Sequence, residues 1–267
     1  MDIKRLMVAV AMSAMVLLGF QYLVPHPDHK AATQPALGAG QETPAAAPGA
    51  DAGNGATDAK DDPRLAINTG RVGGSINLRG ARLDDLVLKD YHETVKPGSP
   101  LVRILDPRQD PQSNLVEVGW LNIAGGQVRV PDATTVWSAD QASLTQDQPV
   151  TLRWDNGQGQ VFELVVAIDQ NYMFSVTQKV HNQAAGPVSL YPYSRVDRAY
   201  TPVETGGYLV HEGPISVIDG RLDESSYKSV RNGTIPPGNT SWNKPGTGGW
   251  SGITDKYWLT AVIPQQD

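Results

Sequence analysis

Three histidine-containing dipeptides could in principle supply acid–base chemistry: His92-Glu93, His181-Asn182 and His211-Glu212. An imidazole and a carboxylate act as general acid and base only when both reach the same substrate. Adjacent side chains on a strand point to opposite faces, so none of these neighbours forms a ready pair. We expect surface or loop histidines. An enzyme would instead need His181 or His211 to face a carboxylate across one concave cleft.

Two glycine-rich segments resemble catalytic loops only in part. Gly249-Trp250-Ser251-Gly252 approaches the nucleophile-elbow pattern, but its second glycine falls one place early and no helical pattern follows. Gly246-Thr247-Gly248-Gly249 lacks the following helix whose N-terminal amides would face a phosphate. We interpret residues 246–249 as a loop.

The remaining polar clusters are equally incomplete. His26 and His29 lack carboxylate support, so we predict that they bind no metal. The doublets Asp61-Asp62 and Asp84-Asp85 are expected on solvated faces. The chain supplies no full set of nucleophile, base, orienting group and oxyanion donor. The sequence therefore predicts a protein that is not an enzyme and has no cofactor or metal site.

The composition favours strands and excludes several classes of protein. The 267 residues include 27 Gly and 20 Pro, and only 19% are charged, which suits short strands joined by turns. The formal net charge of -6, without a Lys/Arg stripe, argues against nucleic-acid binding. The absence of cysteine excludes disulfides, thiolate nucleophiles and Cys-type zinc sites.

An apolar segment near the N-terminus is long enough to cross a bilayer. Leu6 to Val24 contains about nineteen uncharged residues. A cleavable signal peptide is the alternative, but the run exceeds a usual h-region, and Lys30 disrupts the best cleavage-site pair at Ala31 and Ala32. We predict an uncleaved transmembrane helix within residues 1–24. Lys4 and Arg5 stay in the cytoplasm by the positive-inside rule, which places the rest outside it.

Residues 25–62 are rich in Pro, Ala, Gly and acids and offer little to bury. This composition predicts a disordered tether.

From residue 63 to residue 267, short apolar runs separated by turns predict one β-sandwich domain. Its clearest part is a meander of strands over 150–154, 161–168 and 172–177, with a turn at Asn156-Gly157. The nearly continuous apolar run 161–168 is expected to be buried on both faces. Weaker strands are predicted over 76–78, 86–88, 102–105, 116–120, 188–193 and 258–263.

Aromatic residues gather near the end of the chain at Trp250, Tyr257 and Trp258. Tyr257 and Trp258 fall on alternate faces of the predicted strand, so at least one of them should face a core. A partner surface at the rim that uses Trp250 is the alternative. We therefore keep these three residues as candidates for a core strand or for partner contacts.

Three segments resemble the YidC-type membrane protein insertase family of Gram-negative bacteria. They are "GSINLRGARLDDLVLKDYHETVKPGSPLVRILDP" (74–107), "GWLNIAGG" and "GGWSGITDKYWLTAVIP". The resemblance implies an all-β, twisted β-sandwich domain of the supersandwich, mutarotase-like form, in the periplasm after one N-terminal transmembrane helix. In the family, further strands, a linking helix and five transmembrane helices follow. We therefore expect the domain at 63–267 to be truncated at its C-terminus, with unpaired sheet edges. No position matches the charged residue of the family's membrane groove.

The resemblance implies an inner-membrane insertase and chaperone whose N-terminus is cytoplasmic and whose main domain is periplasmic. Its implied partners are the Sec translocon with its accessory subunits, nascent integral membrane proteins and the lipid bilayer. Because twisted sandwiches are shared with carbohydrate-active proteins, a membrane-anchored periplasmic carbohydrate-binding or mutarotase-like protein is the alternative. An isolated adhesion or scaffold module is a third possibility.

Overall fold

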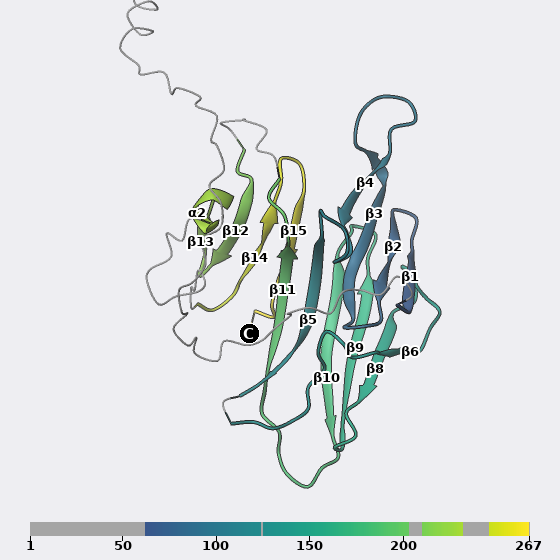
Figure 1. Cartoon of the computed structure of the whole chain (residues 1–267), viewed down its shortest axis with the longest axis vertical. Helices are drawn as coiled ribbons and strands as arrows, with labels where there is room; N and C mark the ends of the chain where they lie inside the picture. Colours follow the sequence, from purple (N-terminus) through teal and green to yellow (C-terminus); the bar gives the residue numbers. More distant parts are fainter. Residues whose placement is uncertain (1–61, 124, 203–209, 232–245, 267) are drawn as a thin grey trace, which may run out of the picture. The chain divides into compact units, whose positions relative to one another are not determined.

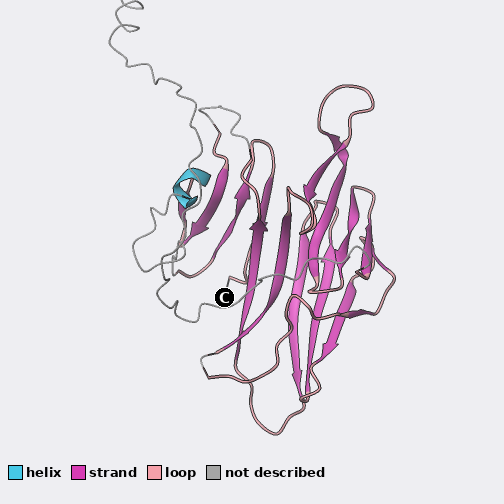
Figure 2. Ribbon diagram, viewed as in Figure 1, coloured by secondary structure: helices cyan, strands magenta, loops and turns pink. Residues whose placement is uncertain are grey.

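The computed structural model describes residues 62–123, 125–202, 210–231 and 246–266. These residues form strands and one short helix, α2 (Tyr227–Arg231) (Figures 1 and 2). The predicted anchor at 1–24 and residues 25–61 of the predicted tether lie outside the described residues. Within the described ranges, no helix has the length and apolar character needed to span a membrane.

The first sheet contains seven strands. They are β1 (Arg64–Asn68), β2 (Val72–Asn77), β3 (Arg82–His92), β4 (Leu101–Leu105), β5 (Asn114–Asn122), β7 (Ser143–Leu144) and β11 (Leu190–Arg198). Their order is β11-β5-β3-β2-β1-β7, with β4 also paired to β3. The pairing of β1 with β7 is parallel, whereas β1–β2, β2–β3, β3–β4, β3–β5 and β5–β11 are antiparallel. The register shifts between Ser75 and Ile76, which leaves Asp84 of β3 without a partner residue in β2.

The second sheet confirms the predicted meander. Its strands are β6 (Ser138–Ala139), β8 (Val150–Asp155), β9 (Gln160–Ile168) and β10 (Phe174–Asn182), in the order β10-β9-β8-β6. Gly157 has a φ of 71° in the turn between β8 and β9, as expected of an Asn-Gly turn. Tyr172 has a φ of 67° and lies in a turn, so β10 begins later than predicted. The predicted burial of β9 on both faces is wrong: its alternate residues are only half-buried, because Glu163 and its neighbours face outward.

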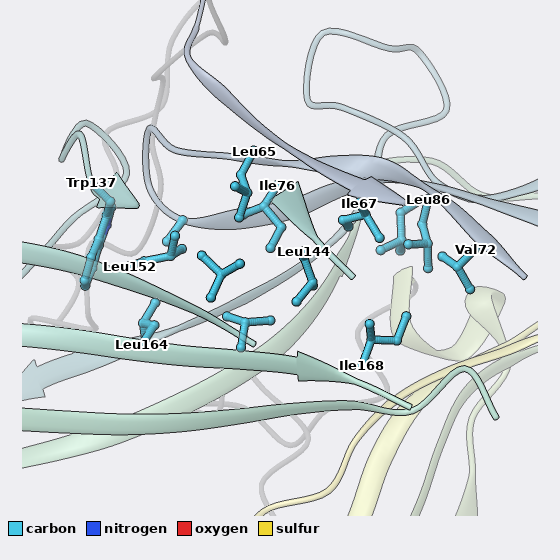
Figure 3. Packing of buried hydrophobic residues seen from close by; sticks show 14 of the residues in the cluster. Leu65, Ile67, Val72, Ile76, Leu86, Trp137, Leu144, Leu152, Leu164 and Ile168 are labelled. Carbon is cyan, nitrogen blue, oxygen red and sulfur yellow. The ribbon is translucent and has the colours of Figure 1, made fainter. Parts of the chain in front are cut away.

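Apolar side chains of the first and second sheets form the core (Figure 3). Leu65 and Ile76 of the first sheet belong to the same buried cluster as Leu152 and Leu164 of the second. Full burial of such a side chain contributes about 1.5–3 kcal/mol of hydrophobic stabilisation. The two sheets therefore form a β-sandwich, which confirms the all-β fold expected from the turn spacing and from the family resemblance.

A third sheet extends this sandwich. It contains β12 (Gly213–Ile218), β13 (Arg221–Glu224), β14 (Gly249–Thr254) and β15 (Leu259–Val262), all antiparallel and in the order β13-β12-β14-β15. Both β14 and β15 contact β11, the edge strand of the first sheet (Figure 1). β15 corresponds to the predicted strand 258–263, whereas no strand was predicted at β12, β13 or β14.

The doublet Asp84-Asp85 does not lie on a solvated face, so that prediction is wrong. Asp84 has no exposed side-chain surface, is paired with Arg64, and lies 3.8 Å from Nε of the equally buried Arg82. Asp85 accepts a hydrogen bond of 2.7 Å from the Ser75 hydroxyl and pairs with Arg103. Alternation along β3 places Asp84 on the same buried face as Leu86 and Leu88, which explains the error.

Asp62, the last residue of the predicted tether, also carries a buried carboxylate. Its side chain is 2% exposed and accepts hydrogen bonds from Nε of Arg79 at 2.7 Å and from the Asn77 amide at 3.2 Å. The body therefore includes Asp62, one residue before the predicted boundary. Asp61, the other half of this doublet, lies outside the described residues.

Replacing the buried carboxylate of Asp84 should destabilise the domain strongly. In Asp84→Ala, the guanidinium of Arg82 stays buried but loses a compensating charge, which typically costs about 3–5 kcal/mol. The measurement is the free energy of urea unfolding of the full chain, followed by tryptophan fluorescence. Asp147→Ala, at an exposed position, is the control and should change stability by less than about 0.5 kcal/mol. Equal effects of the two substitutions would contradict this account of Asp84.

Candidate functional site

A cleft of about 490 Å³ lies where the first and third sheets meet. Strands β3, β4, β11 and β15, together with the turn between β14 and β15, contribute side chains to it. It is lined by Val87, Glu93, Pro100, Leu101, Arg103, Ile104, Asp106, Asp110, Gln112, Arg198, Tyr200, Asp255, Trp258 and Thr260. Its volume falls within the range of small-molecule and peptide sites. The cleft is therefore the candidate functional site of the described residues.

Arg198 joins the elements that form this cleft. Its Nη1 and Nη2 atoms donate hydrogen bonds of 2.6 and 2.9 Å to the two carboxylate oxygens of Asp255, and Nη1 also lies 2.7 Å from the Tyr227 hydroxyl of α2. The Arg198 side chain is only 3% exposed. Burial by itself lowers the pKa of this guanidinium, but the hydrogen bonds and charge of Asp255 outweigh burial and raise it. Arg198 is thus a fixed cation that holds β11 against the turn between β14 and β15.

The β4 side of the cleft is acidic. Nε of Arg103 lies 3.4 Å from Asp106, and the same guanidinium pairs with Asp85. Burial raises the pKa of the Asp106 carboxyl, and the nearby charges of Asp110 and Asp85 raise it further, although Arg103 opposes this effect. The Arg103 guanidinium is therefore shared between the carboxylates of Asp85 and Asp106.

The three aromatic residues singled out in the sequence occupy different environments. Trp258 is half-buried, lines the cleft and packs against the core cluster. Tyr257 is 75% exposed, and the half-buried Trp250 lies on β14 opposite Val217. β15 begins at Leu259, so Tyr257 and Trp258 belong to the preceding turn rather than to the predicted strand. Trp258 thus has the core contacts that were expected, and a partner contact through any of the three stays a prediction.

Trp258 is also part of an aromatic cluster that links all three sheets. The ring of Tyr91 on β3 lies edge-on to Trp258 at 5.1 Å between centroids, and 6.2 Å from the ring of Tyr172. Asp90 accepts hydrogen bonds from the Tyr172 hydroxyl at 2.7 Å and from Nε of Arg71 at 2.6 Å. Burial, followed by the hydrogen bond to Asp90, raises the pKa of Tyr172 from 10.0 to about 12. The turn before β10 is thereby fixed to β3.

His181 does meet a carboxylate, but it does so outside the cleft. Its Nε2 lies 3.0 Å from Glu163, which also pairs with Arg153 at 2.8 Å. The His181 side chain is 53% exposed on the outward face of the second sheet. The hydrogen bond with His181 is the main reason that the pKa of Glu163 is lowered. His181 and Glu163 thus form a charge pair between neighbouring strands. An enzyme would need a histidine that faces a carboxylate inside the cleft, and His181 does not line the cleft.

The other histidines described here make backbone contacts. Nδ1 of His92 lies 2.6 Å from the Ser99 carbonyl in the hairpin between β3 and β4, and Nε2 of His211 lies 3.0 Å from the Pro214 carbonyl. Among the described residues, no group of three or more His, Asp or Glu is arranged to hold a metal ion. His26 and His29 lie outside the described residues.

The glycine-rich segments belong to the third sheet. Gly249 has a φ of 116°, and a Cβ atom there would lie 1.9 Å from the Val217 carbonyl oxygen, so the close pairing of β14 with β12 requires glycine. Residues 246–248 precede the strand, whereas Gly249 belongs to β14, so the predicted loop is one residue too long. The amide of Thr247 donates a 2.7 Å hydrogen bond to Asp219.

Analysis of the sequence missed Arg198 and Asp255, which organise the cleft. They are 57 positions apart and come from different sheets. Asp255 lies within the segment GGWSGITDKYWLTAVIP, but nothing in that segment points to Arg198. A charged residue such as Arg198 at the end of an otherwise strand-like segment offers a weak signal at most. Their pairing becomes visible only once β11 and the third sheet are placed together.

Comparison with known proteins identifies a family for most of the chain. A family model described as the YidC periplasmic domain matches residues 64–267. The chain is 48% identical over 272 residues to a membrane protein insertase YidC of Granulibacter bethesdensis, an alignment that covers 100% of this chain and 47% of that protein. It is 46% identical over 209 residues to the protein of that name from Acidiphilium cryptum, an alignment that covers 76% of this chain and 35% of that protein. It is 39% identical over 297 residues to a membrane protein insertase YidC of Methylorubrum extorquens, an alignment that covers 100% of this chain and 48% of that protein. The chain spans less than half the length of these relatives.

The two partners of the Arg198–Asp255 pair should differ in their effect on stability. Asp255→Ala leaves an almost fully buried cation without its carboxylate and should cost about 3–5 kcal/mol. Arg198→Met should cost less, because Asp255 is 32% exposed and water can solvate it. The free energy of urea unfolding of the full chain measures both, with the exposed Glu224→Ala as the control. A larger loss for Arg198→Met would refute the proposed asymmetry.

The raised pKa of Tyr172 should be visible in titration. Because the folded protein holds this proton more tightly than the unfolded chain does, its contribution to stability is present below pH 10.0 and is lost as the pH rises toward about 12. Burial also raises the pKa of Tyr193, Tyr200 and Tyr227, so absorbance at 295 nm should show several late-ionising tyrosines, one fewer in Tyr172→Phe. In Asp90→Asn, the Tyr172 step should move to lower pH. Tyr91→Phe, which removes a neighbouring hydroxyl, is the control that should retain it.

Proposed function

The chain belongs to the YidC family of membrane protein insertases, and we propose that it supplies the anchor and periplasmic domain of such an insertase. The insertase aids the insertion, folding and assembly of integral membrane proteins in the bacterial inner membrane. The observation that supports this proposal best is the family match over residues 64–267, reinforced by alignment of the whole chain with an insertase at 48% identity. Nascent membrane proteins are the proposed clients.

Insertion requires no covalent chemistry. Apolar segments lower their free energy when they reach lipid, and the task of an insertase is to reduce the cost of carrying polar flanks across the bilayer. We therefore propose that the domain acts by docking and scaffolding, with the Sec translocon and its accessory subunits as partners. The His181–Glu163 pair lies outside the cleft, so no observation favours a mutarotase-like or carbohydrate-binding function over this one.

The proposed topology places the described domain in the periplasm. The apolar run within residues 1–24 forms the anchor, with Lys4 and Arg5 in the cytoplasm. In this proposal residues 25–61 act as a flexible tether with a root-mean-square span of roughly 35 Å. This span leaves the domain free to reach partners in the same membrane.

Single-cysteine labelling tests this topology, because the natural chain contains no cysteine. Val95→Cys, at a fully exposed position in the hairpin between β3 and β4, should react with a membrane-impermeant maleimide in intact spheroplasts. Asp2→Cys, on the cytoplasmic side, should react only after the membrane is permeabilised. Labelling of both positions, or of Asp2→Cys alone, in intact spheroplasts would overturn the proposed orientation.

A genetic experiment tests the functional assignment. A chimera in which this chain replaces the aligned part of the Granulibacter bethesdensis insertase should support growth of cells depleted of their own insertase. The chain alone should not, because it spans less than half of that relative. A chimera that accumulates in the membrane without restoring growth would contradict the proposal, as would rescue by the chain alone.

A further inference from the structure

The cleft between the first and third sheets has more negative than positive groups. Its lining includes the carboxylates of Glu93, Asp106, Asp110 and Asp255, but only the two guanidinium groups of Arg103 and Arg198. A cleft with an uncompensated charge focuses its electrostatic field on ligands of the opposite sign. Its occupant should therefore carry positive charge.

Both guanidinium groups are already engaged within the domain. Arg198 is held by both oxygens of Asp255, and Arg103 lies between Asp85 and Asp106. Glu93 and Asp110 form no ion pair with any other described residue, and both are exposed at the cleft. These two carboxylates are the unneutralised groups that a ligand can reach without breaking a buried contact.

The rest of the cleft wall suits the other parts of a polypeptide. Leu101, Ile104 and Trp258 supply apolar surface beside the acids. Lysine and arginine side chains combine a charged head with an aliphatic stem, and therefore match a wall in which carboxylates and apolar groups alternate.

We propose that this cleft binds a basic, extended segment of another polypeptide. A lysine or arginine of that segment pairs with Glu93 and Asp110, and its aliphatic stem packs against Trp258. This inference goes beyond the proposed insertase function, since it assigns a charge class to the partner and holds whether or not the chain supports insertion. Failure of the growth experiment above would leave it standing.

Fluorescence anisotropy of the full chain in detergent tests the proposal. The probe is a short fluorescein-labelled peptide that alternates leucine with lysine or arginine, and the comparison peptide replaces each basic residue with glutamine. The basic peptide should bind at least tenfold more tightly, and its affinity should fall as salt is raised. Glu93→Gln combined with Asp110→Asn should weaken its binding about tenfold, since the loss of each exposed ion pair weakens binding by a few-fold. Asp147→Asn, an exposed carboxylate outside the cleft, should leave binding unchanged.

Several outcomes would overturn the proposal. Equal binding of the two peptides would remove the charge requirement, and unchanged binding by the double variant would place the site elsewhere. Free arginine that competes as effectively as the peptide would show a small-cation site rather than a polypeptide site. Crosslinking gives a second readout: Gln112→Cys at the cleft should capture a thiol-reactive form of the basic peptide, whereas Leu222→Cys on β13 should not.

Discussion

The bidentate pairing of the buried Arg198 guanidinium with Asp255 determines how the parts of the domain fit together. A cation that is 97% removed from solvent is tolerated only when hydrogen-bonded opposite charge compensates for lost hydration. Because Arg198 ends β11 and Asp255 follows β14, this requirement holds the third sheet beside the first. The cleft and the position of Trp258 at its edge both follow from that junction. The third sheet is thus held to the first by the Arg198–Asp255 pair, whereas the first and second sheets are held together by apolar packing.

The sequence predicted well those features that depend on neighbouring residues. The meander of β8, β9 and β10 was found because apolar alternation and an Asn-Gly turn lie within one short segment. The third sheet was largely missed, since Gly213-Pro214 opens β12 and glycines occupy β14, which weakens any strand pattern. Asp84 was misplaced because the doublet was treated as isolated, whereas Asp84 shares the buried face of β3 with Leu86 and Leu88. The cleft likewise depends on contacts between distant segments.

The charged side chains of the described residues fit the docking role proposed for this domain. Some of their titratable groups form structural ion pairs, as His181 does with Glu163 on the outer face of the second sheet. Glu93 and Asp110, which form no ion pair with another described residue, lie exposed at the cleft. A surface of this kind offers charge selectivity without strain at a reacting bond. Such selectivity suits the docking role that we propose for this domain.

The pairing of β5 with β11 has a consequence for how the protein is made. β5 ends at Asn122, and the strand that covers its outer edge begins only at Leu190, after the whole second sheet. During synthesis and export, the meander of β8 to β10 can form from local contacts, whereas the edge of β5 in the first sheet stays unpaired until β11 has been made. An unpaired edge is a template for aggregation until it is covered. Chaperoning of this chain is therefore needed most between the emergence of β5 and the arrival of β11.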